Sequence, residues 1–264
     1  MLIKSLIANI IGRFMAAAFF SLCHLLVKKY KAFRIKKLLG PDAGKNRIFH
    51  VFYPGLKLRE IDDEARLFLE KTKSTIIKNL MKDDPVRQSE VRAICYLNNL
   101  FSLVPGKMEI CSDNADDIIK PHEMSQICLG EWNANIRTIN ILEMKENRFI
   151  KMKSNVIRIR KGKGKFVPFP GEIGKDSQFD YGLILRLSGK RKEKKVWIAC
   201  IGNSGWSTSG AAYYLANNWK KLFKSSLSYW KRVLLFPKVK DFAAVIKVKR
   251  GKDDTAELVD FITR

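Results

Sequence analysis

The sequence contains few of the residues that build metal sites and disulfide frameworks. It has five cysteines and three histidines in 264 residues. The cysteines (Cys23, Cys95, Cys111, Cys128 and Cys200) lie far apart and form no C-x-x-C pair, which argues against a structural zinc site or a disulfide-stapled fold. We therefore expect reduced, mostly buried thiols, a cytosolic compartment and no bound metal.

Familiar phosphate-binding and nucleophile motifs are missing as well. Neither G-x-x-x-x-G-K-[ST] nor G-x-G-x-x-G occurs, so hydrolysis of a nucleoside triphosphate is poorly supported. The segment GNSG at 202–205 superficially resembles the nucleophile loop of chymotrypsin-like proteases. It joins a predicted strand to a predicted helix, however, and that junction would need G-x-S-x-G in a serine hydrolase.

Acidic residues are scarce relative to basic ones. Fifty Lys and Arg against 26 Asp and Glu leave a formal charge of +24, so the expected partners are anions: phosphates, nucleic acid or an anionic membrane surface. The hydrophobic content of 46% in a chain of this length excludes a disordered protein and predicts a folded body with a large core.

The N-terminal segment is poor in charge. Between residues 5 and 27 the only charged side chain is Arg13, and KKYKAFRIKK follows directly. A span of about 20 apolar residues crosses a bilayer, and a basic flank stays on the cytoplasmic side. We expect a single-pass membrane helix with its basic flank at 1–37, a linker at 38–46 and a cytoplasmic domain at 47–264; a buried or interfacial helix is the alternative.

Strand-like and helix-like patterns alternate through the rest of the chain. Strands are predicted at 48–54, 108–111, 125–130, 155–160, 181–187, 196–202, 242–251 and 256–263, and helices at 61–69, 91–103, 136–142 and 209–223. This order predicts an α/β fold, a Rossmann-like three-layer sandwich with a mostly parallel sheet.

Two polar loops follow predicted strands and are the expected ligand site, because ligands of open α/β sheets bind at the carboxyl ends of strands. The first loop supplies Gly130, Trp132, Asn133 and Asn135; the second supplies Gly202, Asn203, Ser204, Gly205, Trp206, Ser207, Thr208 and Ser209. Glycines allow close approach of an anion, and hydroxyl and amide groups donate hydrogen bonds to it. Helix capping by a hydroxyl, core packing by a tryptophan and tight turns at the asparagines are the alternatives.

Catalytic candidates are few. Glu131 beside the first loop is the best candidate for a general base, and Ser204 is the only other candidate. The carboxylates Asp113, Asp116, Asp117 and Glu123 are better explained as an acidic cap at a helix start than as metal ligands. A binding protein is therefore favoured over an enzyme.

The segments ICLGEWNAN, DYGLIL and WIACIGNSGWSTSGAAYYLA together resemble the Rossmann-like sensor folds grouped as SLOG-like domains. The resemblance covers the pattern of elements from Ile48 to Val248, with motif-level similarity in the two loops only. It implies a sensor of a nucleotide-derived signal in a bacterial defence or antiviral signalling system, joined to a membrane segment.

These features favour a membrane-anchored cytosolic sensor that binds a nucleotide-like anion between the Gly130 and Gly202 loops. Binding is expected to reach the N-terminal helix through self-association. One alternative is a membrane-tethered enzyme acting on a nucleotide or phosphorylated substrate. The other is a nucleic-acid-binding protein, since ten Lys and Arg interleave with aromatic residues between Lys220 and Arg250. Attraction to an anionic membrane explains the same basic segment.

Overall fold

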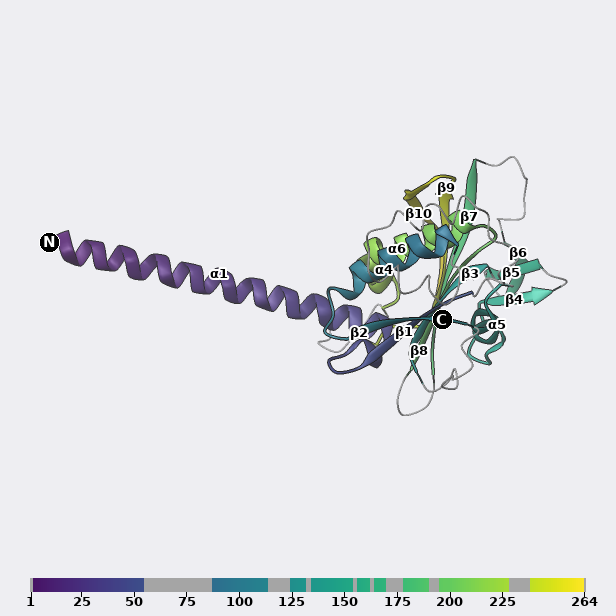
Figure 1. Cartoon of the computed structure of the whole chain (residues 1–264), viewed down its shortest axis with the longest axis horizontal. Helices are drawn as coiled ribbons and strands as arrows, with labels where there is room; N and C mark the ends of the chain where they lie inside the picture. The colour runs from purple at the N-terminus through teal and green to yellow at the C-terminus, as the bar shows by residue number, and fades with distance from the viewer. Residues whose placement is uncertain are drawn as a thin grey trace.

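A computed structural model of the chain has a mixed α/β body and a long N-terminal helix, α1 (Leu2–Leu39), that projects away from it (Figure 1). The structure describes residues 2–54, 87–113, 124–131, 134–153, 156–161, 164–169, 178–189, 195–227 and 238–263. The helix predicted at 61–69 lies outside these residues.

A seven-stranded sheet forms the centre of the body, with the order β10-β9-β7-β8-β3-β1-β2. Its strands are β1 (Ile48–Tyr53), β2 (Lys107–Ser112), β3 (Gln126–Glu131), β7 (Phe179–Ser188), β8 (Val196–Gly202), β9 (Phe242–Lys249) and β10 (Lys252–Thr263). Strands β2, β1, β3 and β8 are parallel neighbours, and β7, β9 and β10 are added antiparallel. Because β9 runs in the direction of β8, the sheet is mainly parallel, as predicted.

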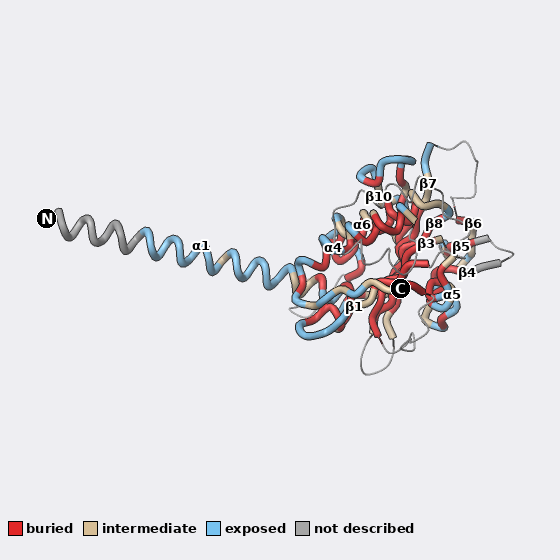
Figure 2. Tube along the Cα trace, viewed as in Figure 1, coloured by how far each residue is buried: buried red, intermediate tan, exposed pale blue. Residues whose placement is uncertain are grey.

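The hydrophobic runs of the sequence become the central strands. Every residue of β8 is buried, and only the last residue of β3 is not. Such continuous runs are typical of strands that are covered on both faces. The edge strand β10 instead has mostly exposed or half-buried residues, consistent with its position at the border of the sheet (Figure 2).

Both faces of the sheet are covered. One face packs against α4 (Gln88–Phe101), α6 (Gly205–Ser225) and the C-terminal end of α1 in one hydrophobic cluster. The other face packs against α5 (Ile136–Glu143) and a small antiparallel sheet. The strands of the small sheet are β4 (Ile150–Lys153), β5 (Val156–Lys161) and β6 (Lys165–Pro168).

The predicted membrane segment is part of α1, a single helix with a short 3-10 turn (Pro41–Ala43) after it. No helix within the described residues has both the length and the apolar character needed to cross a membrane. Leu38, Leu39 and Ala43 are fully buried, so the stretch expected to be a linker packs into the core.

Polar contacts fix the C-terminal end of α1 to the sheet. Arg186 of β7 is buried and donates from Nε to the carbonyl of Leu38 (2.7 Å) and from Nη1 to Asp241 (3.3 Å). Burial lowers the pKa of Arg186 to about 10, against the opposing effect of Asp241. Asp42, just after α1, accepts a hydrogen bond from the backbone of Ser125 (2.7 Å). The end of α1 and the turn after it are therefore joined to β7 and to the residue that precedes β3.

The cysteines are all free. Cys128 and Cys200 are buried in the sheet, where burial raises the pKa of both thiols, whereas Cys95 is exposed. The prediction of reduced thiols is consistent with this arrangement, but only part of the set lies in the core.

Candidate functional site

The two predicted loops begin side by side. Strands β3 and β8 are parallel neighbours, with Gly130 opposite Ile201 and Glu131 opposite Gly202. The order in which strands are added reverses at β1, because β2 lies on one side of β1 and β3 lies on the other, so the switch point is between β1 and β3, next to the first loop. Such a switch point is where ligands bind in open α/β sheets. We call the carboxyl ends of β1, β3 and β8 the carboxyl edge.

The first loop starts with a backbone that only glycine adopts easily. Gly130 has a φ of 117°, and a Cβ there would lie 2.9 Å from Pro54. The next residue, Glu131, forms an ion pair with Arg87 (2.9 Å), the residue that precedes α4. Trp132 and Asn133 lie outside the described residues.

Asn135 caps α5 and is fully buried. Its Oδ1 accepts hydrogen bonds from the backbone N–H groups of Arg137 and Thr138, and its Nδ2 donates to the carbonyls of Phe52 and Leu129. These four contacts use the hydrogen-bonding groups of the side chain. Asn135 therefore joins the first loop to β1 and has nothing left to offer a ligand in this arrangement.

The second loop is shorter than predicted, because α6 begins at Gly205 rather than near Ser209. Ser204 caps the helix: its Oγ accepts from the backbone of Ser207 (3.2 Å), and Ser207 Oγ accepts from the backbone of Ser204 (2.9 Å). This reciprocal capping satisfies two N–H groups. Sequence periodicity missed the first turn because its serines, threonine and glycine carry no apolar stripe.

The candidate nucleophile Ser204 is also bound to a carboxylate. Its hydroxyl donates to Asp180 (2.6 Å), which pairs with Arg250 (2.9 Å). The Ser204 hydroxyl thus donates its hydrogen bond to Asp180, while its oxygen accepts one from the backbone N–H of Ser207. No described histidine contacts Ser204, so the arrangement of a serine hydrolase is absent from the described part of the site.

The hydroxyls that follow point into the body. Ser207, Thr208 and Ser209 are fully buried. Ser209 donates to Asp253 of β10 (2.7 Å), and Arg92 of α4 pairs with the same carboxylate (3.0 Å). These side chains connect α6 to α4 and β10, so the structure uses them for packing between elements.

Trp206 lies beneath a cation at the surface of α6. The guanidinium carbon of Arg92 is 3.9 Å from the centre of the indole ring, a cation–π contact. The contact agrees with the alternative interpretation of Trp206, in which the indole ring packs against neighbouring side chains. Asn203, by contrast, is exposed at the tip of the loop and is the side chain of this loop most open to a ligand.

The glycines of the second loop serve close packing. A Cβ at Gly202 would overlap Ser207, and a Cβ at Gly205 would lie 2.8 Å from Ser89 of α4. Gly205 therefore lets the starts of α4 and α6 approach each other. The first turns of both helices meet at the carboxyl edge for this reason.

Glu90 was not among the predicted site residues. It lies in the first turn of α4, is 2% exposed, and accepts a hydrogen bond from Ser89 Oγ (3.1 Å). Burial raises its pKa to about 7; the charge of Arg87 opposes this and that of Glu131 adds to it. The signal was visible in the sequence, since Glu90 shares the buried face of the helix with Ile94 and so places an acid on an apolar stripe.

Arg87, Glu90 and Glu131 thus form a charged cluster at the edge where α4, α5 and α6 all begin. The N-terminal ends of helices carry partial positive charge and favour anions. A carboxyl group with a pKa close to neutral suits proton transfer. Among the described residues, no group of His, Cys, Asp and Glu has the geometry to hold a metal ion.

Comparisons of the chain with family models and with curated proteins found no match.

Proposed function

We propose that the protein is a membrane-attached sensor whose α/β domain binds a nucleotide-like anionic ligand at the carboxyl edge. The observation that carries the proposal is the pairing of Glu131 with Gly202 on neighbouring strands, which brings the two polar loops and the starts of three helices to one place. Converging helix N-termini favour a phosphate or carboxylate.

Arg87 is the residue proposed to contact the ligand. Its side chain is 38% exposed and forms an ion pair with Glu131. An incoming phosphate offers a second, stronger partner for the guanidinium, since charge-assisted bonds to phosphate are among the strongest in proteins. Asn203, exposed on the neighbouring loop, would add an amide donor.

The wider role follows from the Rossmann-like order of elements and the resemblance to SLOG-like sensors. In this proposal a bacterial defence or signalling system supplies the nucleotide-derived signal, and binding promotes self-association. The contacts of Arg186 with the end of α1 supply a physical route from the sheet to the helix. The helix in turn attaches the domain to the cytoplasmic face of an anionic membrane.

A second candidate function is an enzyme at the same edge, and Glu90 is the observation that favours it. A buried carboxyl with a pKa of about 7 is suited to exchange a proton with a bound substrate at neutral pH. In this case a nucleotide or phosphorylated substrate is turned over by the wild type. Glu90→Gln should then bind the substrate but convert it at a rate reduced about a hundredfold or more.

The test is a ligand screen on the full-length chain. Thermal shift and calorimetry with mono-, di- and cyclic nucleotides, with inorganic phosphate as reference, should identify a ligand that raises the melting temperature. Arg87→Ala should weaken binding of that ligand about tenfold or more, because the variant loses one charge-assisted contact.

Lys107→Ala is the matched control, because Lys107 is an exposed cation at the opposite end of the parallel strands. It should bind as the wild type does. The proposal fails if no nucleotide stabilises the wild type, or if the two variants bind a stabilising nucleotide equally well.

A further inference from the structure

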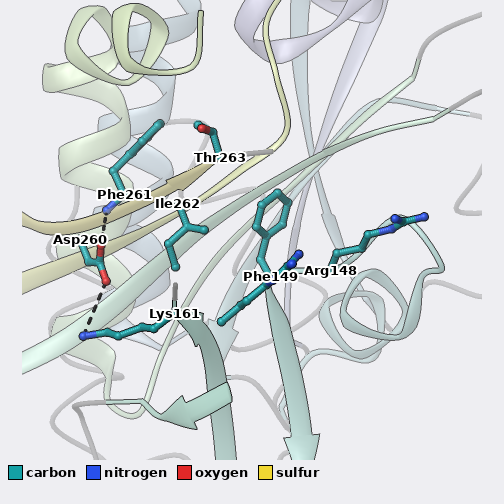
Figure 3. A pocket seen from close by; sticks show the side chains of 8 residues that line it. Arg148, Phe149, Lys161, Asp260, Phe261, Ile262 and Thr263 are labelled. Atoms are coloured by element: carbon teal, nitrogen blue, oxygen red, sulfur yellow. Dashed lines mark hydrogen bonds and ion pairs between the residues drawn. The ribbon is translucent and has the colours of Figure 1, made fainter. Parts of the chain in front are cut away.

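A cavity lies far from the carboxyl edge, between the C-terminal end of β10 and the small sheet. Its volume is about 670 Å³, and its walls include Arg148, Phe149, Arg160, Lys161, Asp260 and Ile262 (Figure 3). Ligand pockets usually measure about 300 to 1,000 Å³, so the cavity is large enough for a nucleotide unit.

Three of the eight residues that line this cavity are cations, against one acid. Arg148 and Lys161 are exposed, Arg160 is half-buried, and Asp260 is the acid among the described lining residues. Asp260 meets Lys161 at 3.8 Å, a long ion pair in which the lysine side chain remains 57% exposed. Neither arginine pairs with a described carboxylate, so the cavity presents positive charge to solvent.

The small sheet extends this charge beyond the cavity. Its strands hold two basic residues in β4, three in β5 and one in β6, and no acidic residue. Because Ile157 and Ile159 are buried against the main sheet, Arg158 and Arg160 point to the opposite face of β5.

On that face, like charges are placed next to each other. Lys151 is directly opposite Arg158, an arrangement that costs stability. Lys151 lies over the ring of Phe166 (4.6 Å), which is opposite Arg160. The Nε atom of Arg158 is buried and has no described hydrogen-bond partner. An extended anion on this face would relieve the repulsion between Lys151 and Arg158.

The position of the small sheet points to a partner from the aqueous phase. The sheet lies on the side of the body away from the projecting part of α1 (Figure 1). A membrane contacted by α1 would therefore not reach this surface. Basic grooves that include aromatic side chains bind single-stranded nucleic acid, with cations along the backbone and rings stacked on bases.

We infer that the outer face of β4–β6 and the adjoining cavity bind single-stranded nucleic acid. The phosphates follow Lys151, Arg158 and Arg160, and a base stacks on Phe166. This site is separate from the carboxyl edge, so it does not depend on the nucleotide-like ligand proposed there.

The experiment measures the fluorescence anisotropy of a labelled oligouridylate of about 15 nucleotides with the full-length chain. Affinity is followed between about 50 and 200 mM salt. The double variant Arg158→Gln/Arg160→Gln should bind about tenfold or more weakly and reduce the log–log salt slope by about 1.4, or about 0.7 for each lost phosphate contact. Phe166→Ala should weaken binding about fivefold or more without changing the slope.

Lys45→Gln/Lys107→Gln is the matched control, since it removes two exposed cations elsewhere on the body. It should retain the wild-type slope to within about half a unit. Melting curves of all variants check the fold. The inference is overturned if the wild type does not bind, if the control loses as much as the arginine variant, or if a mononucleotide or anionic vesicles displace the oligonucleotide at equal phosphate concentration.

Discussion

At the scale of single residues, Glu90 links the candidate site to stability. Its pKa of about 7 in the folded chain lies above the ordinary value of 4.5, because burial penalises the carboxylate. The folded state therefore binds more protons than the unfolded state between these two pH values. It follows that the contribution of Glu90 to the free energy of unfolding is lost as the pH rises from about 4.5 to 7.

Glu90→Gln should remove this pH dependence. The variant and the wild type should have similar stability near pH 4.5, and the variant should be more stable at pH 8 by up to about 3 kcal/mol. Chemical denaturation across this range measures the difference. Asp254→Asn, at an exposed position of β10, is the control and should change little. A constant difference between Glu90→Gln and the wild type at every pH would contradict the assignment.

Residue types were easier to predict than residue roles. The sequence predicted a polar loop at 202–209, and those residues do lie at the carboxyl edge. Burial decides what they do: Ser207, Thr208 and Ser209 turn inward, and Gly205 accommodates Ser89. A sequence pattern does not show the direction of a side chain when capping and ligand binding use the same hydroxyl groups.

At the scale of elements, strands were predicted well because their patterns are long and unbroken. The apolar runs of β7 and β8 and the short strand β1 fall close to their predicted bounds. The start of α6 and the packing of residues 38–46 were missed. Both depend on contacts with distant parts of the chain, such as Ser204 with Asp180 and Asp42 with Ser125, which local periodicity does not contain.

The junction between α1 and the sheet depends on Arg186. Removing its guanidinium should take from the carbonyl of Leu38 its side-chain donor and from Asp241 its cationic partner, with Ser188 Oγ (2.6 Å) still donating to Asp241. Arg186→Met should therefore lower the free energy of unfolding by about 3 kcal/mol or more, as expected when one partner of a buried ion pair is lost. Denaturant unfolding of the full chain measures the loss.

A second variant separates charge from shape at this junction. Arg186→Lys keeps the charge but not the planar donor fork, so we expect an intermediate loss of stability. Amide exchange at the C-terminal turn of α1 should rise in both variants relative to the rest of the helix. Unchanged exchange there would show that the junction does not depend on Arg186.

At the scale of the whole molecule, the exposed surfaces of α1 and of the small sheet differ in chemistry and lie on different sides of the body (Figure 1). The outer part of α1 exposes large apolar side chains, among them Phe14, Phe19, Phe20 and Leu26, each more than half exposed. The small sheet on the other side of the body exposes Lys151, Lys161 and Lys165, beside the half-buried Arg158 and Arg160. Apolar groups left in water at this density favour a lipid or protein partner. The basic residues at the end of the apolar stretch favour an anionic one.

The last prediction concerns this helix. The wild-type chain should cosediment with vesicles that contain phosphatidylserine, and added salt should weaken binding only in part, because apolar burial does not depend on ionic strength. Phe19→Glu/Phe20→Glu removes two rings that are 64% and 71% exposed. Each buried ring contributes about 1.5 to 3 kcal/mol, so partitioning should fall about a hundredfold or more.

Leu103→Glu/Val259→Glu is the control for the helix variant, because it changes two exposed apolar residues of the body, and it should bind vesicles as the wild type does. Equal binding by both double variants would mean that the body, through its positive charge, holds the protein on the vesicle, and would remove α1 from the proposed mechanism.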